Sequence, residues 1–238
     1  MATAEEGSIV AIAAESREFA GLLAHASSVS RLDWGIDFAR RAAIGGEPWI
    51  LAANGPGPNL AAQAASAALR QARPRALLST GFCGGLDPAL APGDVFVASR
   101  ILAPSSSREF FPLPAPSARP HAAGNLISID RVAVTSAERR TLSQSGGRAV
   151  DMEAAAVAGA AERYETPFYC IRVVSDTAGE EMPLDFNRYR DAAGRFSRGR
   201  IVAAALLRPA SIPGLWRLDA RCRRAAVNLG DFLADCRF

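Results

Sequence analysis

Short, almost continuously apolar runs recur along this chain, and stretches with the composition of helices separate them. Four of these runs are SIVAIAA at 8–14, WILAAN at 49–54, ALLSTGFCGGL at 76–86 and PFYCIRVVSD at 167–176. A strand that is apolar at nearly every position is buried on both faces, as happens when helices cover both sides of a sheet. The alternation of such strands with helices therefore predicts an α/β fold.

The other segments fit the same pattern. Further strands are expected at 94–102, 125–134 and 148–150, and helices at about 16–25, from an N-cap at Asn59, from about Ser136 and again after Glu153. The Pro- and Ser-rich segment 103–124 should be a long loop. After residue 176 we expect helices, broken at Pro209 and Pro213. We find no internal repeat or interdomain linker, so we expect one domain over 1–238 with a basic helical C-terminal extension from about residue 200.

The composition is that of an ordinary globular protein. The chain has 238 residues, of which 49% are hydrophobic and 21% charged. We see no apolar window of the roughly 18 residues needed to span a bilayer. The start, MATAEEGSIV, has acids where a signal peptide has a basic region, so we expect a cytoplasmic location.

Charge and cysteine patterns narrow the classes of partner. From Arg195 to the end there are nine Arg and three Asp, but no aromatic interleaving or reader motif typical of nucleic-acid binding. The basic tail is either a solvated helical face or a surface that binds an anionic membrane. The four cysteines are scattered without metal-ligand spacing, so we expect free, mostly buried thiols and no metal.

Acids and glycines gather where the expected strands end. They are Glu15 and Glu18, Thr80-Gly81-Phe82-Cys83-Gly84-Gly85, Asp151-Met152-Glu153, and Ser175-Asp176. Each group has a plain structural interpretation, as a helix cap, a first-turn acid, a core side chain or a tight turn. Open α/β sheets, however, bind ligands beyond the carboxyl ends of their strands. The coincidence of all these groups at one sheet edge predicts a ligand site there.

Three segments carry a resemblance to a known family. TGFCGGLDPALAPGDVFVAS, VDMEAAAVAGAAERYETPFYCIRVVSDTA and IAAESREFAGLL resemble the nucleoside phosphorylase and nucleosidase superfamily, in particular its methylthioadenosine/S-adenosylhomocysteine nucleosidases. The resemblance extends from residue 9 to about 178 and implies a three-layer αβα sandwich around a central mixed sheet. SIDRVAVTSAERRTL and LLRPASIPGLWRLDARCRRAA are similar to the hopanoid-associated phosphorylase group, which is linked to the removal of adenine from adenosyl-hopane.

The resemblance implies cleavage of an N-ribosidic bond through an oxocarbenium-like transition state. Asp176 matches the acid that donates a proton towards purine N7, and Ser175 would orient it. Such a carboxyl must hold its proton at neutral pH. Glu153 matches the acid that binds the ribose hydroxyls, and its charge complements the developing ribosyl cation. Met152 would lie against the sugar, and Asp151 is expected to cap the following helix.

The nucleophile is the next question. Glu18 in one register, or Glu15 in another, would activate a water molecule. Phosphorylases of the superfamily hold phosphate with an Arg and a Ser, and this chain has Ser79 and Phe82 at those places. Loss of a guanidinium and a hydroxyl favours hydrolysis, although Arg17 or another Arg could substitute and allow phosphorolysis. A non-catalytic nucleoside-binding module is a further alternative.

At the positions that would contact the base and the 5′ side of the nucleoside, this chain departs from the pattern of the nucleosidases. Thr80 and Gly81 form the glycine-rich bend, and Phe82 is a candidate for stacking on the base. Phe110 and its neighbour Phe111 either receive an apolar 5′ substituent or fold into a small cluster within their own loop. We expect no cofactor, and the resemblance implies a homo-oligomer.

Overall fold

The computed structural model describes residues 5–238, which are built around a ten-stranded mixed sheet. The order of its main path is β11-β10-β8-β12-β7-β2-β5-β4-β3, and β9 pairs with β8. These strands are β2 (Ile9–Ala13), β3 (Ala26–Arg31), β4 (Phe38–Ile44), β5 (Glu47–Ala53), β7 (Ala76–Gly85), β8 (Val95–Ala103), β9 (Arg108–Phe110), β10 (Ala122–Ser128), β11 (Ala149–Asp151) and β12 (Phe168–Asp176). A separate parallel pair joins β1 (Glu5–Glu6) to β6 (Ala72–Arg73).

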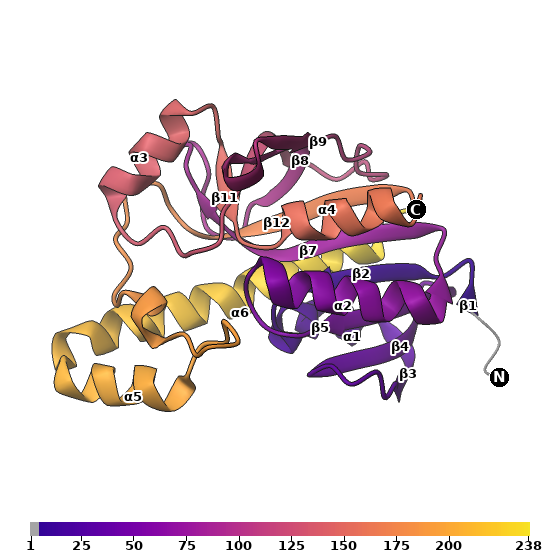
Figure 1. Cartoon of the computed structure of the whole chain (residues 1–238), viewed down its shortest axis with the longest axis horizontal. Helices are drawn as coiled ribbons and strands as arrows, with labels where there is room; N and C mark the ends of the chain where they lie inside the picture. The colour runs from indigo at the N-terminus through magenta and orange to yellow at the C-terminus, as the bar shows by residue number, and fades with distance from the viewer. Residues whose placement is uncertain (1–4) are drawn as a thin grey trace.

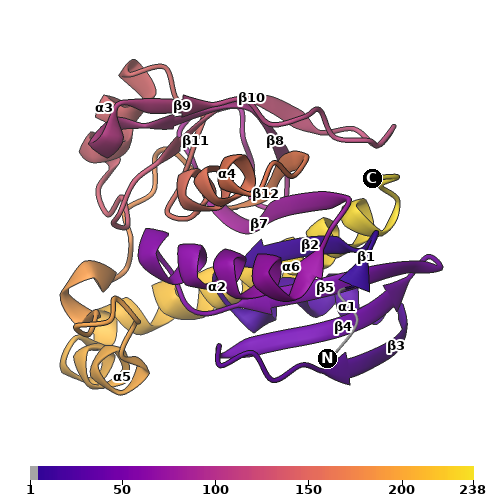
Figure 2. The same ribbon diagram turned by 45° about the vertical axis from the view of Figure 1, so that its right-hand side comes forward.

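Helices cover both faces of the sheet (Figures 1 and 2). The helices are α1 (Ala20–Ala24), α2 (Pro58–Gln71), α3 (Ser136–Gln144), α4 (Ala154–Arg163), α5 (Arg198–Leu207) and α6 (Ile212–Ala234). On one face α2 and α4 lie side by side, and on the other α1 packs against α6. The predicted α/β sandwich with a central mixed sheet is confirmed.

The middle of the sheet is parallel and apolar, as the runs of buried residues predict. Strands β5, β2, β7 and β12 run parallel to one another, and every residue of β2 is buried. Their carboxyl ends therefore lie at one edge. The alanines of α2 and α4 bring these helices close together over the sheet, because a small side chain allows close backbone approach.

Strand β11 joins this edge from the opposite direction. It is parallel to β10 but antiparallel to β7, with Val150 opposite Gly84. Strands β7, β11, β10, β8 and β12 thus close into a ring. The long strand β7 bends at Gly84 and Gly85, where added Cβ atoms would come within 3.1 and 3.2 Å of atoms of Asp176. The predicted meeting of the two acidic segments is therefore produced by ring closure as well as by parallel strand ends.

Several predicted boundaries were wrong. The hairpin of β3 and β4 was missed, because β3 is exposed on nearly all of its residues and lacks an apolar run. Helix α2 is capped by Gly57 and starts at Pro58, so Asn59 is already helical. The segment expected to be one long loop contains β9, and β10 begins within it at Ala122.

The C-terminal part also differs from the prediction. Residues 177–197 contain only the 3₁₀ turn η3 (Phe186–Tyr189) and are otherwise irregular. The break at Pro209 is present as the 3₁₀ turn η4 (Pro209–Ser211). Pro213, in contrast, lies in the first turn of α6 and does not break it, because backbone amides in the first turn of a helix have no hydrogen-bond partner within the helix. The second half of α6 packs into the core through Leu229 and Phe232.

Two further expectations concern the surface and the thiols. None of the helices in residues 5–238 is long and apolar enough to cross a membrane. All four cysteines are buried, as predicted. Burial raises the pKa of Cys170 and of Cys236 to about 12, so both thiols stay protonated and act as small apolar groups.

Candidate active site

A cavity of about 720 Å³ opens where β2, β7, β11 and β12 end. This volume is in the range of small-molecule sites. Seven of the predicted site residues line it: Glu18, Phe82, Asp151, Met152, Glu153, Ser175 and Asp176. Other parts of its wall come from residues 14–17 and 131–133, from the segment after β12, and from α3, α5 and α6.

Glu18 lies in the 3₁₀ turn η1 (Ser16–Phe19), and its carboxylate is fixed by two backbone amides. The amide of Glu15 donates to Oε2 at 2.7 Å, and that of Phe82 donates to Oε1 at 2.9 Å. Gly81 has φ +121°, and a Cβ there would lie 2.6 Å from Oε1, so this approach requires glycine. Burial raises the pKa of Glu18, and the two amides only partly oppose it. The group can therefore exchange a proton nearer to neutral pH than an exposed glutamate.

Glu15 has a different environment from Glu18. Its carboxylate forms an ion pair with Arg17 at 2.7 Å and is 25% exposed. It lines the same cavity, but at a partly solvated position. Glu15 is therefore tied to Arg17 at the partly solvated position, whereas Glu18 is enclosed and held by two backbone amides.

Arg172 is the main residue that sequence reasoning missed. It lies on β12 with a fully buried side chain, and Nη2 is 2.5 Å from Asp151 Oδ2. Its guanidinium also donates to the Thr80 carbonyl at 2.6 Å and to Ser79 Oγ at 2.7 Å. The signal in the sequence was a single charged residue within an apolar strand, since a buried arginine needs a buried acid.

Asp151 combines two roles. Its Oδ2 accepts from the amide of Ala154 at 2.8 Å, and from that of Glu153 at 3.3 Å, so it satisfies the start of α4 as predicted. The same oxygen pairs with Arg172. The carboxylate is therefore a structural anchor between β11, α4 and β12.

Glu153 is the acid that remains available at this side of the cavity. Its Oε1 accepts from the amide of Gly57 at 2.8 Å, whereas Oε2 is 3.9 Å from Arg172. Burial, followed by the nearby charge of Asp151, raises the pKa of Glu153 to about 7. Met152, beside it in the chain, also lines the cavity.

Asp176 stands at the end of β12 with its carboxyl held by two side chains. The Ser175 hydroxyl donates to Oδ1 at 2.5 Å. The buried guanidinium of Arg139, from α3, forms an ion pair with Oδ2. That contact is not aligned as a hydrogen bond, and Oδ2 accepts none from the described residues. Asp176 lines the cavity, so its carboxyl is placed beside a ligand that binds there.

The remaining predicted residues divide into three cases. Thr80 and Gly81 do not line the cavity; Thr80 supports Arg172, and Gly81 makes room for Glu18. Phe82 lines the cavity, and the Arg17 guanidinium lies 5.7 Å from its ring centre. Phe110 is not brought to the cavity at all. It belongs to β9, and the pairing of β9 with β8 turns it into the core, where it is only 5% exposed.

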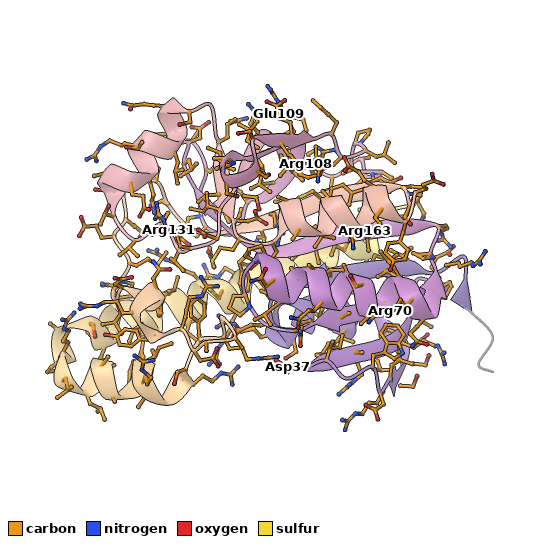
Figure 3. The ribbon with its side chains drawn as sticks, viewed as in Figure 1. Asp37, Arg70, Arg108, Glu109, Arg131 and Arg163 are labelled. Carbon is orange, nitrogen blue, oxygen red and sulfur yellow. The ribbon has the colours of Figure 1, made fainter. Side chains whose placement is uncertain are left out.

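A second feature missed from the sequence is the apolar part of the cavity wall. Met182, Phe186 and Phe196 reach it from the irregular segment after β12, and Ile201 and Leu218 reach it from α5 and α6. Arg131 also lines the cavity, and Figure 3 shows it between α3 and the α5–α6 part of the chain. None of these apolar residues directly follows a strand end: Met182, Phe186 and Phe196 lie in a segment without a periodic pattern, and Ile201 and Leu218 lie on helices. Reasoning from strand ends therefore did not find them.

Comparisons with known proteins agree with this geometry. The sequence matches the family described as the phosphorylase superfamily over residues 8–129 and 118–207. The chain belongs to the phosphorylase superfamily. The prediction of an enzyme of this superfamily is thereby confirmed.

Two relatives of this phosphorylase-superfamily member are 5′-methylthioadenosine/S-adenosylhomocysteine nucleosidases. The one from Tolumonas auensis is 28% identical over 192 residues, which cover 68% of this chain and 83% of the relative. The one from Listeria monocytogenes is 25% identical over 193 residues, covering 67% and 82%.

Solved structures share the fold. A 5′-methylthioadenosine/S-adenosylhomocysteine nucleosidase from Neisseria meningitidis, in complex with methylthio-immucillin-A, has a TM-score of 0.72 and 23% identity over 96% of this chain and 97% of that one. The futalosine hydrolase of Helicobacter pylori has a TM-score of 0.71 and 16% identity over 95% of each chain. Within residues 5–238, no three or more His, Cys, Asp or Glu side chains are grouped so that they could bind a metal ion.

Proposed function

We propose that this protein hydrolyses the N-ribosidic bond of an adenine nucleoside that carries a 5′ substituent and releases the base. One observation carries the proposal: two separate sets of buried carboxyl groups line a single nucleoside-sized cavity. Glu18 and Glu153 form one set, and Asp176 with Ser175 forms the other. The nucleosidase relatives support the reaction class.

The sugar would bind against Glu153 and Met152. Glu153 Oε2 accepts no aligned hydrogen bond from the side chains around it, so ribose hydroxyls would donate to it. As the bond to the base breaks, positive charge develops on the ribosyl group, and the ionised carboxylate stabilises it. Glu18 would take a proton from the attacking water, a role that its raised pKa suits.

The base would leave beside Asp176. We assign the carboxyl of Asp176 to purine N7. As general acid it would transfer a proton to N7 as the bond to the base breaks, while the Ser175 hydroxyl and Arg139 hold the carboxyl in place.

Water is the nucleophile that the arginines favour. Arg172 is fully buried, does not line the cavity and is committed to Asp151, Ser79 and Thr80. The cavity-lining Arg17, Arg131 and Arg139 each form an ion pair with an acid, and Arg198 lies 3.9 Å from Glu15. A phosphate dianion on any of the first three would have to displace that acid. Phosphorolysis is kept as the second candidate because Arg17 adjoins Glu18 and is exposed enough to turn towards a ligand.

The apolar wall supports the choice of substrate. Phe186, Phe196, Ile201 and Leu218 give the cavity a side that matches an alkyl or polycyclic 5′ group better than a free hydroxyl. Adenosyl-hopane, which the resemblance of the sequence suggested, has a 5′ group of this kind. The homo-oligomeric state and the cytoplasmic location stay predictions.

The test measures free adenine from the full-length protein. Adenosine, methylthioadenosine and a 5′-alkyl adenosine are each incubated with and without phosphate. We expect release without phosphate, with the largest kcat/KM for the 5′-alkyl substrate. A strict need for phosphate would replace hydrolysis with phosphorolysis. Tight binding of these nucleosides without any adenine would leave only a nucleoside-binding module.

A further inference from the structure

Exposed apolar side chains gather in one part of the molecule. Val202, Leu206, Leu207 and Trp216 are 58, 70, 84 and 76% exposed. All four belong to the helical hairpin formed by α5, η4 and the first turns of α6 (residues 198–217). We call these four side chains the hairpin apolar surface. Clustering of this kind marks an interaction site more often than single exposed apolar residues do.

Helix α5 has more apolar surface than its neighbours can bury. Its inner positions Ile201, Ala204 and Ala205 pack with Ile212 and Leu215 of α6. After the first turn the opposite side is also apolar, with Val202, Ala203 and Leu206 exposed. A helix that is apolar on all sides is normally buried, so a further layer is needed to cover this side.

The charge around this surface is of one sign. Residues 192–218 contain five arginines and no Asp or Glu. Arg198 and Arg200 precede the apolar part of α5, Arg208 follows it, and Arg217 adjoins Trp216; all four are exposed. An apolar face flanked by arginines, with a tryptophan among its members, has the composition of segments that lie in the interface of an anionic bilayer.

The hairpin is placed where such a contact would serve the cavity. Both views show α5 projecting from the sheet-containing body, joined to it through α6 (Figures 1 and 2). Phe196, Ile201 and Leu218, from the hairpin and the residues beside it, also line the cavity. One side of this arm therefore contacts the cavity while another offers apolar and basic groups to the outside.

We propose that the hairpin apolar surface docks onto the surface of an anionic lipid bilayer. The apolar side chains enter the headgroup and acyl boundary, and the arginines bind lipid phosphates. No helix of the described chain can span a bilayer, so the contact is peripheral. A second copy of the chain is a poorer occupant, because a two-fold contact would bring together two sets of the four exposed arginines of this surface.

Vesicle sedimentation of the full-length protein tests this proposal. The vesicles contain either phosphatidylcholine alone or phosphatidylcholine with phosphatidylglycerol. We expect binding to the anionic vesicles that weakens as salt increases. Leu206→Ser with Leu207→Ser should weaken it at least about tenfold, and Trp216→Ala should also weaken it. Phe111→Ser is the matched control, because Phe111 is 71% exposed but follows β9, which lies well away from α5.

Each outcome decides for or against the proposal. No sedimentation with anionic vesicles, or equal sedimentation of wild type and the double Leu variant, overturns it. A smaller particle for the double Leu variant than for wild type in size-exclusion chromatography assigns the surface to a contact between copies instead. Circular dichroism verifies that the variants are folded. The vesicles contain no nucleoside, so failure of this proposal and failure of the proposed activity are distinguishable.

Discussion

Two groups of acids and arginine border the cavity, and they use the arginine differently. In the first, Arg172 is buried behind the cavity, pairs with Asp151 and is the nearest cation to Glu153. In the second, Arg139 lines the cavity and pairs with Asp176 alone. Arg172 is thus shared between Asp151 and Glu153, whereas Arg139 pairs with one acid, Asp176.

The difference lies in what surrounds the acids that line the cavity. Arg172 pairs with Asp151, and burial then dominates at Glu153 and Glu18, whose pKa values are raised. The Asp176 carboxyl is instead held by its own arginine and by the Ser175 hydroxyl. Raised pKa values are thus found on the side of the site where the arginine lies behind the cavity.

The largest effect is expected when the second group loses its proton donor. Asp176→Asn keeps the size of the side chain but cannot donate an acidic proton. Adenine release should fall by about 10²- to 10⁴-fold in kcat, the usual contribution of a general acid. The measurement is single-turnover release of adenine.

Ser175→Ala is the matched control at the same strand end. It removes the hydroxyl that lies 2.5 Å from Oδ1 and 3.2 Å from the Cys83 carbonyl but leaves the acid in place, so its loss should be smaller than that of Asp176→Asn. Substantial activity of Asp176→Asn, at more than a tenth of wild type, would remove Asp176 from the role of acid.

The second largest effect is a loss of stability, and it is expected in the group that contains Arg172 and Asp151. Arg172→Met leaves the buried Asp151 without its cation, so we expect the free energy of unfolding to fall by about 3–5 kcal/mol. Arg139→Met should cost less, because the side chain of Asp176 is 9% exposed whereas that of Asp151 is fully buried. Urea unfolding of the two variants checks the order. Equal losses would contradict the distinction between the shared and the one-to-one arginine.

The sequence predicted the central part of the fold and the acids of the site, for physical reasons. Strands such as 8–14 and 167–176 are apolar at nearly every position, and their carboxyl ends must meet at one edge. Because these ends meet, Glu18, Glu153 and Asp176 are expected to lie together even when no side-chain contact is known. The family resemblance adds the role that each of these acids is expected to have.

What the sequence did not reveal depends on long-range packing. Arg139 occupies an ordinary polar position of α3 until the fold brings α3 over the end of β12. Phe110 looked like an exposed loop residue, but the pairing of β9 with β8 buries it. The apolar cavity wall after β12 has no periodicity, because its side chains are held by tertiary contacts rather than by a helix or strand.

The smallest expected effect is a change of kcat/KM with pH, and it tests whether Glu153 titrates under the influence of Asp151. With a pKa of about 7, the Glu153 carboxyl changes from mostly neutral to mostly ionised between about pH 6 and 8. If the ionised form binds the ribose, kcat/KM should rise about tenfold over this interval. Asp151→Asn should move the rise to lower pH, because it removes the neighbouring negative charge that opposes ionisation.

Stability should change in the opposite direction over a related interval. The folded pKa of Glu153 is above its ordinary value of 4.5, so its contribution to stability is complete below about pH 4.5 and is lost as pH rises through about 7. Activity therefore grows as this part of the stability disappears. Glu153→Gln, which cannot ionise, should remove both slopes, and a stability profile identical to wild type would show that Glu153 is not the group that titrates.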